Sequence, residues 1–181
     1  MNIKSVAVYC GHQMGNNPQF AVDAAKIGEL LARNKIRLVY GGSNAGLMGA
    51  VAQAAVDNGG DVIGISTDAV SQLQEPLHAD ITVEMMPGVN ARKDRMFELS
   101  DAFIILPGGL GTLNELTDLL TMHHIGESKK PIIFLDTGKY WEIFGQLFSY
   151  MDAAGFIENV NDYVMTVCQT PDAVISTLRT L

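Results

Sequence analysis

The segment LPGGLGTLNEL, residues 106–116, combines a bare backbone with an acidic side chain. Three glycines stand where an apolar run ends and a helix-like stretch begins. Glycine lets the main chain turn tightly and approach a ligand closely, and the first amides of a helix are unpaired donors at the positive end of its dipole. The segment therefore predicts an anion site with the carboxylate of Glu115 beside it.

Glu115 has two interpretations at this point. The run from Thr112 to Glu115 fits a capping box, in which the glutamate returns to the N-cap amide and has only a structural role. Alternatively, the carboxylate points into a crevice beside the anion, where it could stabilise a developing cation or take a proton from water. The residues alone leave both interpretations open.

Two further glycine-bearing loops follow expected strands, one at residues 10–15 and one at residues 41–46. A single glycine loop before a helix is as easily a tight turn. Two of them, at 41–46 and 107–111, favour phosphate binding. Neither carries the Gly-Lys-Ser/Thr of a triphosphate loop or the GxGxxG of a dinucleotide site. The scarcity of cations nearby indicates a single phosphate group.

The main basic cluster is the run of residues 92–95, Arg-Lys-Asp-Arg, inside an expected helix. On a helix, positions 92 and 93 share a face with Met96 and Leu99, so one of the cations must lie near the packed side. A buried guanidinium needs a partner. That partner could be an internal carboxylate or a ligand phosphate, and both remain possible.

The elements that position these residues alternate between short apolar runs and amphipathic stretches. Several of the expected strands are continuously apolar, which is typical of a parallel sheet covered on both faces. The sequence predicts one α/β domain over residues 1–181, Rossmann-like and doubly wound, with a mainly parallel sheet of about seven strands flanked by helices. Such sheets bind ligands beyond the carboxyl ends of their strands. We expect strands at 5–10, 37–40, 61–66, 81–85, 102–106, 131–135 and 163–168, helices at 17–34, 47–58, 90–99, from 112, around Trp141 and from 171, and a loop at 71–80.

Composition restricts the kinds of partner. The chain has 181 residues, 48% of them apolar, and a net charge of −8, which fits neither a nucleic-acid-binding surface nor a polybasic membrane patch. No apolar run approaches the ~20 residues that span a bilayer, and the N-terminus does not fit a signal peptide. Cys10 and Cys168 are expected to be buried, reduced thiols. We therefore expect a cytoplasmic protein with no nucleic-acid or membrane partner.

The run 107–115, Pro-Gly-Gly-Leu-Gly-Thr-Leu-Asn-Glu, resembles the PGGxGTxxE motif of the Lonely Guy (LOG) family. Members of that family are cytokinin riboside 5′-monophosphate phosphoribohydrolases. The likeness covers nearly the whole chain and continues at 39–49, at Met86 with Arg92, Lys93 and Met96, at 100–103, at 130–131 and at 155–157. Such proteins are often called lysine decarboxylases, but no lysine here has a recognisable pyridoxal-phosphate context.

The resemblance implies hydrolysis of the N-glycosidic bond of an AMP-like, possibly N6-modified, purine nucleoside 5′-monophosphate, giving free base and ribose 5-phosphate. It implies no cofactor, no metal and a homodimer with residues near the motif helices at the interface. It makes Arg92 and Glu115 the catalytic pair. The substrate- and phosphate-binding residues would be Gly11, His12, Gly41, Gly42, Gly46, Met86, Lys93, Pro107, Gly108, Gly109, Gly111 and Thr112.

The sequence also departs from the family pattern. His12 replaces a usual serine, Ser43 a third glycine and Asn114 a second glutamate, and residues 122–126 replace a usual Trp-x-Gln-Leu-Gly. These changes question the preferred base more than they question hydrolysis. The alternative function is a non-catalytic nucleotide or molybdenum-cofactor carrier of the same fold, and pairing of the motif arginine with the motif glutamate favours the enzyme.

Overall fold

The computed structural model describes residues 3–73 and 81–181. Its strands are β1 (Ser5–Tyr9), β2 (Arg37–Tyr40), β3 (Val62–Thr67), β4 (Thr82–Met86), β5 (Ala102–Ile105), β6 (Ile132–Leu135) and β7 (Met165–Cys168). Its helices are α1 (Gln19–Arg33), α2 (Gly46–Asp57), α3 (Asp68–Leu73), α4 (Val89–Glu98), α5 (Leu110–His124), α6 (Glu142–Ala153) and α7 (Pro171–Thr180), with 3₁₀ turns η1 (Thr137–Lys139) and η2 (Val160–Asp162).

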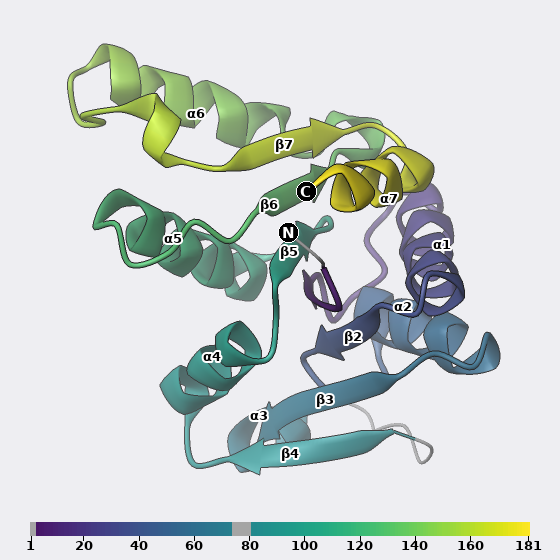
Figure 1. The fold of residues 1–181 in the computed structure, drawn as a ribbon. Helices are drawn as coiled ribbons and strands as arrows, with labels where there is room; N and C mark the ends of the chain where they lie inside the picture. The colour runs from purple at the N-terminus through teal and green to yellow at the C-terminus, as the bar shows by residue number, and fades with distance from the viewer. Residues whose placement is uncertain (1–2, 74–80) are drawn as a thin grey trace.

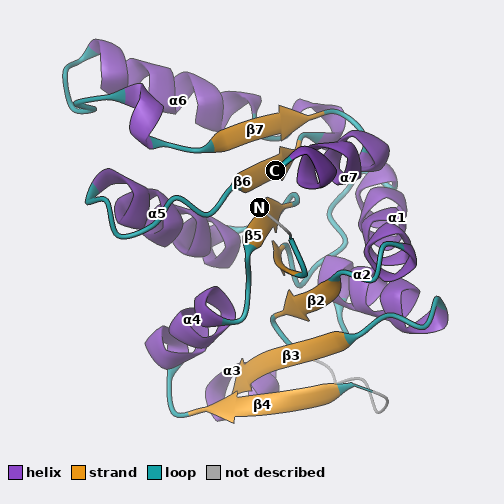
Figure 2. Cartoon of the chain, in the orientation of Figure 1, coloured by secondary structure: helices purple, strands orange, loops and turns teal. Residues whose placement is uncertain are grey.

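The strands form one sheet in the order β4-β3-β2-β1-β5-β6-β7, and every neighbouring pair is parallel. Helices α1, α2 and α7 cover one face, and α4, α5 and α6 cover the other (Figure 1; Figure 2). The chain builds outward from β1 to β4 and then returns to place β5 on the other side of β1. The predicted parallel, doubly wound α/β fold is confirmed, and the order of the strands reverses between β1 and β5.

Alternate residues of the central strands supply two separate cores. Val6 and Val8 of β1 belong to the core beneath α1, α2 and α7, whereas Ala7 and Tyr9 belong to the core beneath α4 and α5. All four are at most 3% exposed. Burial on both faces explains why these strands read as continuous apolar runs rather than as alternating ones.

Several boundaries differ from the expected ones. The helix expected from Thr112 begins at Leu110, because Gly109 takes the extended N-cap conformation. A short helix, α3, follows β3, so residues 71–73 are helical and not part of a loop as expected. The rest of the expected loop, residues 74–80, lies outside the described part of the chain. Trp141 precedes α6 as its N-cap residue, and the last strand begins only at Met165.

None of the helices in residues 3–73 and 81–181 is long and apolar enough to cross a membrane.

Candidate active site

The three glycine-bearing loops meet at the carboxyl edge of the sheet, around the point where the strand order reverses. The Gly11 amide donates to the Pro107 carbonyl at 3.0 Å, and the Gly11 carbonyl accepts from the Leu47 amide at 3.0 Å. Gly11 thus links the loop after β1 to the loop after β5 and to the start of α2. Open parallel sheets place their ligands at this position.

These loops enclose a crevice made of three adjoining hollows. The central hollow, of about 130 Å³, is bordered by Gly41, Arg92, Thr112 and Glu115. A hollow of about 330 Å³ between α4 and α5 shares Glu115 with it, and an outer hollow of about 230 Å³ shares Gly109. Together they offer room for an elongated polar ligand that passes the glutamate.

The start of α5 supplies main-chain donors to the central hollow. Gly109 is the N-cap residue in an extended conformation, and no described side chain caps this helix end. The preceding loop packs so closely that a Cβ on Gly108 would lie 2.2 Å from Thr112 Oγ1 and 2.9 Å from the Gly11 amide nitrogen. Glycine is therefore required at position 108, and the uncapped amides are suited to an anion.

Arg92 is held rigidly in the floor of the crevice. It is only 8% exposed, and its Nε donates to the Ile65 carbonyl at 2.8 Å while Nη2 donates to the Gly41 carbonyl at 3.2 Å. A Cβ on Gly41 would lie 2.3 Å from Nη2, so that glycine makes room for the guanidinium. Of the two expected partners, the internal carboxylate is present, since Nη1 lies 3.8 Å from Glu115 Oε1. The other partners of Arg92 are the two main-chain carbonyls, which the sequence did not indicate.

Glu115 faces Arg92 instead of the helix cap. Because α5 begins at Leu110, Thr112 already lies inside the helix and is not its N-cap, so the capping-box interpretation is wrong. The Glu115 side chain is 12% exposed. Burial raises the pKa of Glu115 to about 7, against the lowering effect of the charges on Arg92 and Lys93. A carboxylate with such a pKa can accept a proton near neutral pH.

Comparison with known proteins decides the family. The family model described as "Possible lysine decarboxylase" matches residues 48–178. The cytokinin riboside 5′-monophosphate phosphoribohydrolase of Rhodococcoides fascians is 38% identical over 180 residues, which are 97% of this chain and 89% of that protein. Arabidopsis thaliana LOG1, of the same name, is 32% identical over 179 residues, 97% and 83% of the two chains. The chain belongs to the LOG family.

Solved structures share the fold at lower sequence identity. A molybdenum cofactor binding protein from Rippkaea orientalis superposes with a TM-score of 0.73 at 24% identity, over 99% of this chain and 98% of that one. The Moco carrier protein of Chlamydomonas reinhardtii gives a TM-score of 0.74 at 18% identity, over 97% and 95%. Because both identities are below 25%, this likeness shows only that the chain has the same fold as these proteins.

The description of the family model names a decarboxylase, which would imply pyridoxal phosphate on a neutral lysine. Among the described residues that border the crevice, Lys93 is the only lysine. Its ammonium group pairs with Asp118 and donates to Asn114 Oδ1 at 3.0 Å. A lysine whose ammonium group is already paired with a carboxylate does not fit a Schiff base with pyridoxal phosphate.

Most of the residues that the LOG motifs nominate lie around the crevice. Three of them do not border any of its hollows. Met86 ends β4 and packs against the core beneath α4 and α5, Gly42 lies in the loop before α2, and Gly46 is the first residue of α2. Their part in substrate binding stays a prediction. The residues that do border it are Gly11, His12, Gly41, Arg92, Lys93, Pro107, Gly108, Gly109, Gly111, Thr112 and Glu115.

Sequence reasoning missed two wall residues at the end of β1. Tyr9 borders both the central hollow and the hollow between α4 and α5, and Cys10 borders the central one. Burial and the nearby Glu115 raise the pKa of both groups, so they stay neutral. Their place immediately before the Gly11 loop could have marked them. In the sequence, however, they read as part of an apolar strand.

The replacement of the usual third glycine by Ser43 also has a structural explanation. Ser43 is fully buried, and its hydroxyl accepts from the Ala45 amide at 3.1 Å. This contact closes the turn before α2.

Proposed function

We propose that this protein hydrolyses the N-glycosidic bond of a purine nucleoside 5′-monophosphate to free base and ribose 5-phosphate. The observation that carries the proposal is the buried Arg92–Glu115 pair beside the uncapped start of α5. The names of the curated LOG relatives support the same reaction. In this assignment the glycine loops and Thr112 hold the 5′-phosphate, and Arg92 and Glu115 act at the sugar.

The reaction builds positive charge on the sugar as the bond from C1′ to the base breaks. Ionised Glu115 stabilises that oxocarbenium character and takes a proton from the attacking water, whose oxygen forms the new bond to C1′. The base leaves with the electron pair of the broken bond and takes up one proton, so that overall the water supplies the new hydroxyl group of ribose 5-phosphate and the proton of the free base. Arg92, fixed by the Ile65 and Gly41 carbonyls, orients the carboxylate. The phosphate is bound away from C1′, so its binding energy serves to orient the sugar.

The direct test is incubation of the purified protein with AMP and with its N6-isopentenyl analogue, with free base measured by chromatography. Release of base from either compound is expected, and their ratio defines the preferred base. A protein that binds AMP but releases no base from any nucleoside 5′-monophosphate would instead be a carrier, the second candidate. The carrier names belong to structural neighbours below 25% identity, so they favour it less than the curated relatives favour the hydrolase.

The pKa of Glu115 predicts the acidic limb of the pH profile. Burial raises this pKa from 4.5 to about 7. Because the ionised form is the active one, kcat/KM for AMP should fall about tenfold per pH unit below that value and level off above it. Steady-state rates across the range in which the protein stays folded would test this. A limb centred near the ordinary glutamate pKa would contradict the assignment of Glu115 as the titrating base.

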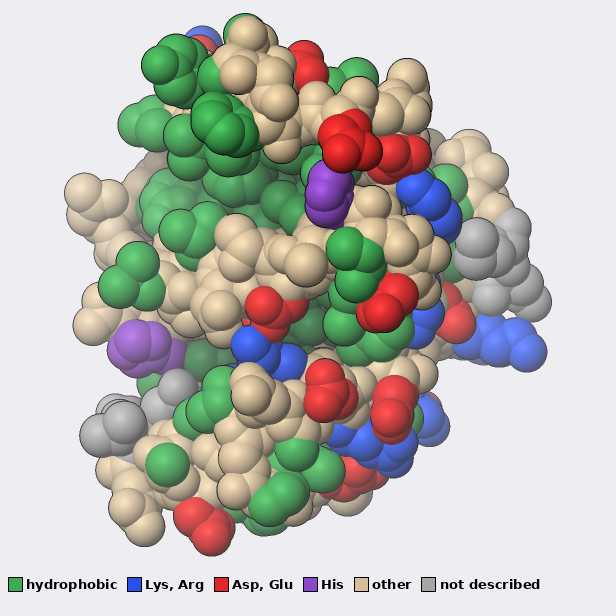
Figure 3. Space-filling model, turned by 90° about the vertical axis from the view of Figure 1, so that its left-hand side faces the viewer, with side chains coloured by type: hydrophobic (Ala, Val, Ile, Leu, Met, Phe, Trp, Pro, Cys, Tyr) green, Lys and Arg blue, Asp and Glu red, His purple; other side chains and the backbone are tan. Residues whose placement is uncertain are grey.

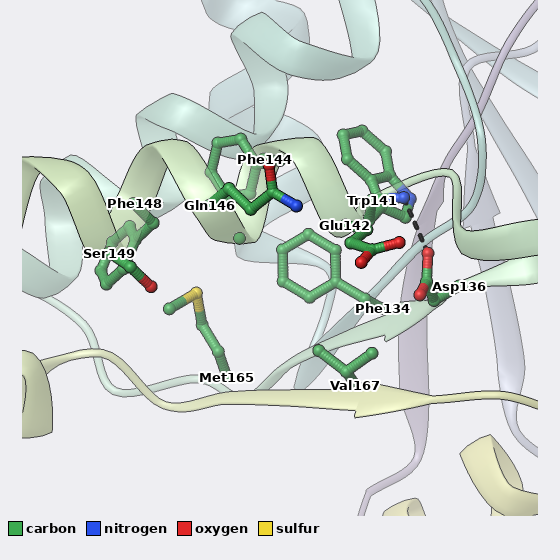
Figure 4. A pocket seen from close by; sticks show the side chains of 11 residues that line it. Phe134, Asp136, Trp141, Glu142, Phe144, Gln146, Phe148, Ser149, Met165 and Val167 are labelled. Carbon is green, nitrogen blue, oxygen red and sulfur yellow. Dashed lines mark hydrogen bonds between the residues drawn. The ribbon is translucent and has the colours of Figure 1, made fainter.

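We also propose that the protein is a homodimer that associates through α6, which lies beside the motif helix α5. The helix has no buried residue, and Ile143, Leu147 and Tyr150 form a stripe on one side with 76%, 52% and 73% exposure. Between α6 and the edge strand β7 lies an apolar hollow of about 600 Å³, larger than those of the crevice and bordered by Phe144 and Val167 (Figure 4). Hydrophobic side chains gather in the upper part of Figure 3, where α6 lies. Such a patch is typical of a surface that another chain covers.

Replacing Leu147 with glutamate should weaken the dimer at least about 100-fold, because a charge would be buried against apolar side chains. Light scattering coupled to size-exclusion chromatography would give the mass at several concentrations. Val22→Glu is the matched control, since Val22 is 58% exposed on α1, across the sheet from α6. A parent protein that is monomeric at every concentration would exclude the dimer.

A cytoplasmic location is the remaining part of the proposal. Cys10 and Cys168 are both free and buried. Free thiols are usual in a reducing compartment, where disulfides are rare.

A further inference from the structure

The turn after β6 places Tyr140 against the loop at residues 107–111, which is proposed to bind the 5′-phosphate. We propose that Tyr140 is a positioning residue that fixes the orientation of the peptide between Gly108 and Gly109, and thereby aims the Gly109 amide at the 5′-phosphate. This inference rests on the proposed function of the crevice. Its basis is the hydrogen bond that the Tyr140 hydroxyl donates to the Gly108 carbonyl.

The geometry of the peptide bond connects this contact to the ligand. The described chain has no cis peptide, so the Gly108 carbonyl and the Gly109 amide point in opposite directions. Tyr140 and Gly108 border the outer hollow, whereas Gly109 borders both the outer and the central hollow. A carbonyl held toward Tyr140 therefore turns the Gly109 N–H toward the side on which Thr112 and Glu115 lie.

Without the hydroxyl, nothing comparable among the described contacts holds that carbonyl. A peptide between two glycines rotates at low cost, since neither residue has a Cβ to restrict it. In the flipped orientation the Gly108 oxygen would face the phosphate and repel it. Only molecules with the unflipped peptide would bind the phosphate, so the apparent affinity is the intrinsic affinity multiplied by the unflipped fraction.

The turn itself is built to present Tyr140. Gly138 and Lys139 both have positive φ, 63° and 62°, and a lysine there is held against its own preference. The buried Thr137 hydroxyl donates to Asp23 at 2.5 Å, which ties the turn to α1. The Tyr140 ring meets Phe20 edge to face, with 5.7 Å between ring centres. Anchors of this kind leave the hydroxyl little freedom to move off Gly108.

The test is Tyr140→Phe, which keeps the ring and removes only the donor. We expect KM for AMP to rise about tenfold while kcat changes by no more than about twofold. If the peptide is flipped in about nine-tenths of the molecules, only the remaining tenth binds AMP, and the reaction of the bound molecules is unaffected. Hydrolysis of adenosine, which lacks the phosphate, should be unchanged, and ribose 5-phosphate should inhibit about tenfold more weakly. Tyr163→Phe is the matched control, since its hydroxyl is also hydrogen-bonded, to His124 Nδ1 at 3.2 Å, and it does not border the crevice.

An unchanged KM for AMP in Tyr140→Phe would reject the inference, and so would an equal loss on AMP and adenosine, which would indicate a general defect. Calorimetric titration with ribose 5-phosphate separates this inference from the proposed function. Suppose that the parent binds ribose 5-phosphate, that Tyr140→Phe binds it about tenfold more weakly, and that neither protein cleaves AMP. The proposed hydrolase activity would then be wrong, but the positioning role of Tyr140 would stand. A parent that binds neither ribose 5-phosphate nor AMP would overturn both.

Discussion

Replacement of Glu115 by glutamine is expected to lower kcat for AMP hydrolysis by about 10³ while AMP still binds. Removal of a general base costs roughly 10² to 10⁴ in rate, and here the same carboxylate also faces the developing charge on the sugar. The proposed phosphate contacts lie at the start of α5 and in the loops after β1 and β2, which the substitution leaves intact. Single-turnover rates together with calorimetric AMP titration would separate the two effects.

Loss of fold is an alternative cause of lost turnover, and the pKa of Glu115 argues against it. Burial raises this pKa above its ordinary value, so the buried anion lowers stability as pH rises from 4.5 through about 7. At about pH 8 the neutral glutamine variant should therefore be at least as stable as the parent. Glu98→Gln, whose side chain is 65% exposed on α4, is the matched control and should keep full activity. A Glu115→Gln protein that cleaves AMP at the parental rate would remove this residue from the mechanism.

The positions of the loops could be predicted from the sequence because they depend on local patterns. Apolar runs of four to six residues marked the strands, and glycine-rich segments at 41–46 and 107–111 marked their carboxyl ends. The parallel sheet then requires those ends to meet at one edge. The start of α5 was misplaced by two residues, since an extended glycine N-cap has no side chain to reveal it.

The contacts that decide the chemistry depend on tertiary structure and left no local signal. The Ile65 carbonyl that fixes Arg92 belongs to a strand 27 positions earlier in the chain. Main-chain acceptors are the same at every residue, so no sequence pattern could nominate this one. Tyr140 likewise reaches the Gly108 carbonyl across 32 positions, from a turn whose residues looked unremarkable in the sequence. Family resemblance nominated Arg92, and only the fold shows why it is rigid.

Substitution of Arg92 is expected to cause the second large loss of kcat/KM. Two substitutions separate the contribution of its positive charge from that of its fixed hydrogen bonds. Arg92→Lys keeps the charge but cannot donate from fixed positions to both carbonyls, so kcat/KM should fall about 10²-fold with the acidic limb still near pH 7. Arg92→Met removes the charge as well. Because the charge on Arg92 lowers the pKa of Glu115, its loss should move that limb to higher pH and reduce kcat/KM further.

The methionine variant also leaves the Ile65 and Gly41 carbonyls without their buried donor, which should destabilise the fold by roughly 1–3 kcal/mol. Rates must therefore be measured well below its thermal midpoint. Arg95→Met is the matched control on the same helix, since Arg95 pairs instead with Glu84 and Glu98, away from the crevice. An acidic limb that stays in place in Arg92→Met would show that Glu115 does not sense this charge. The pair would then not be the unit that acts on the sugar.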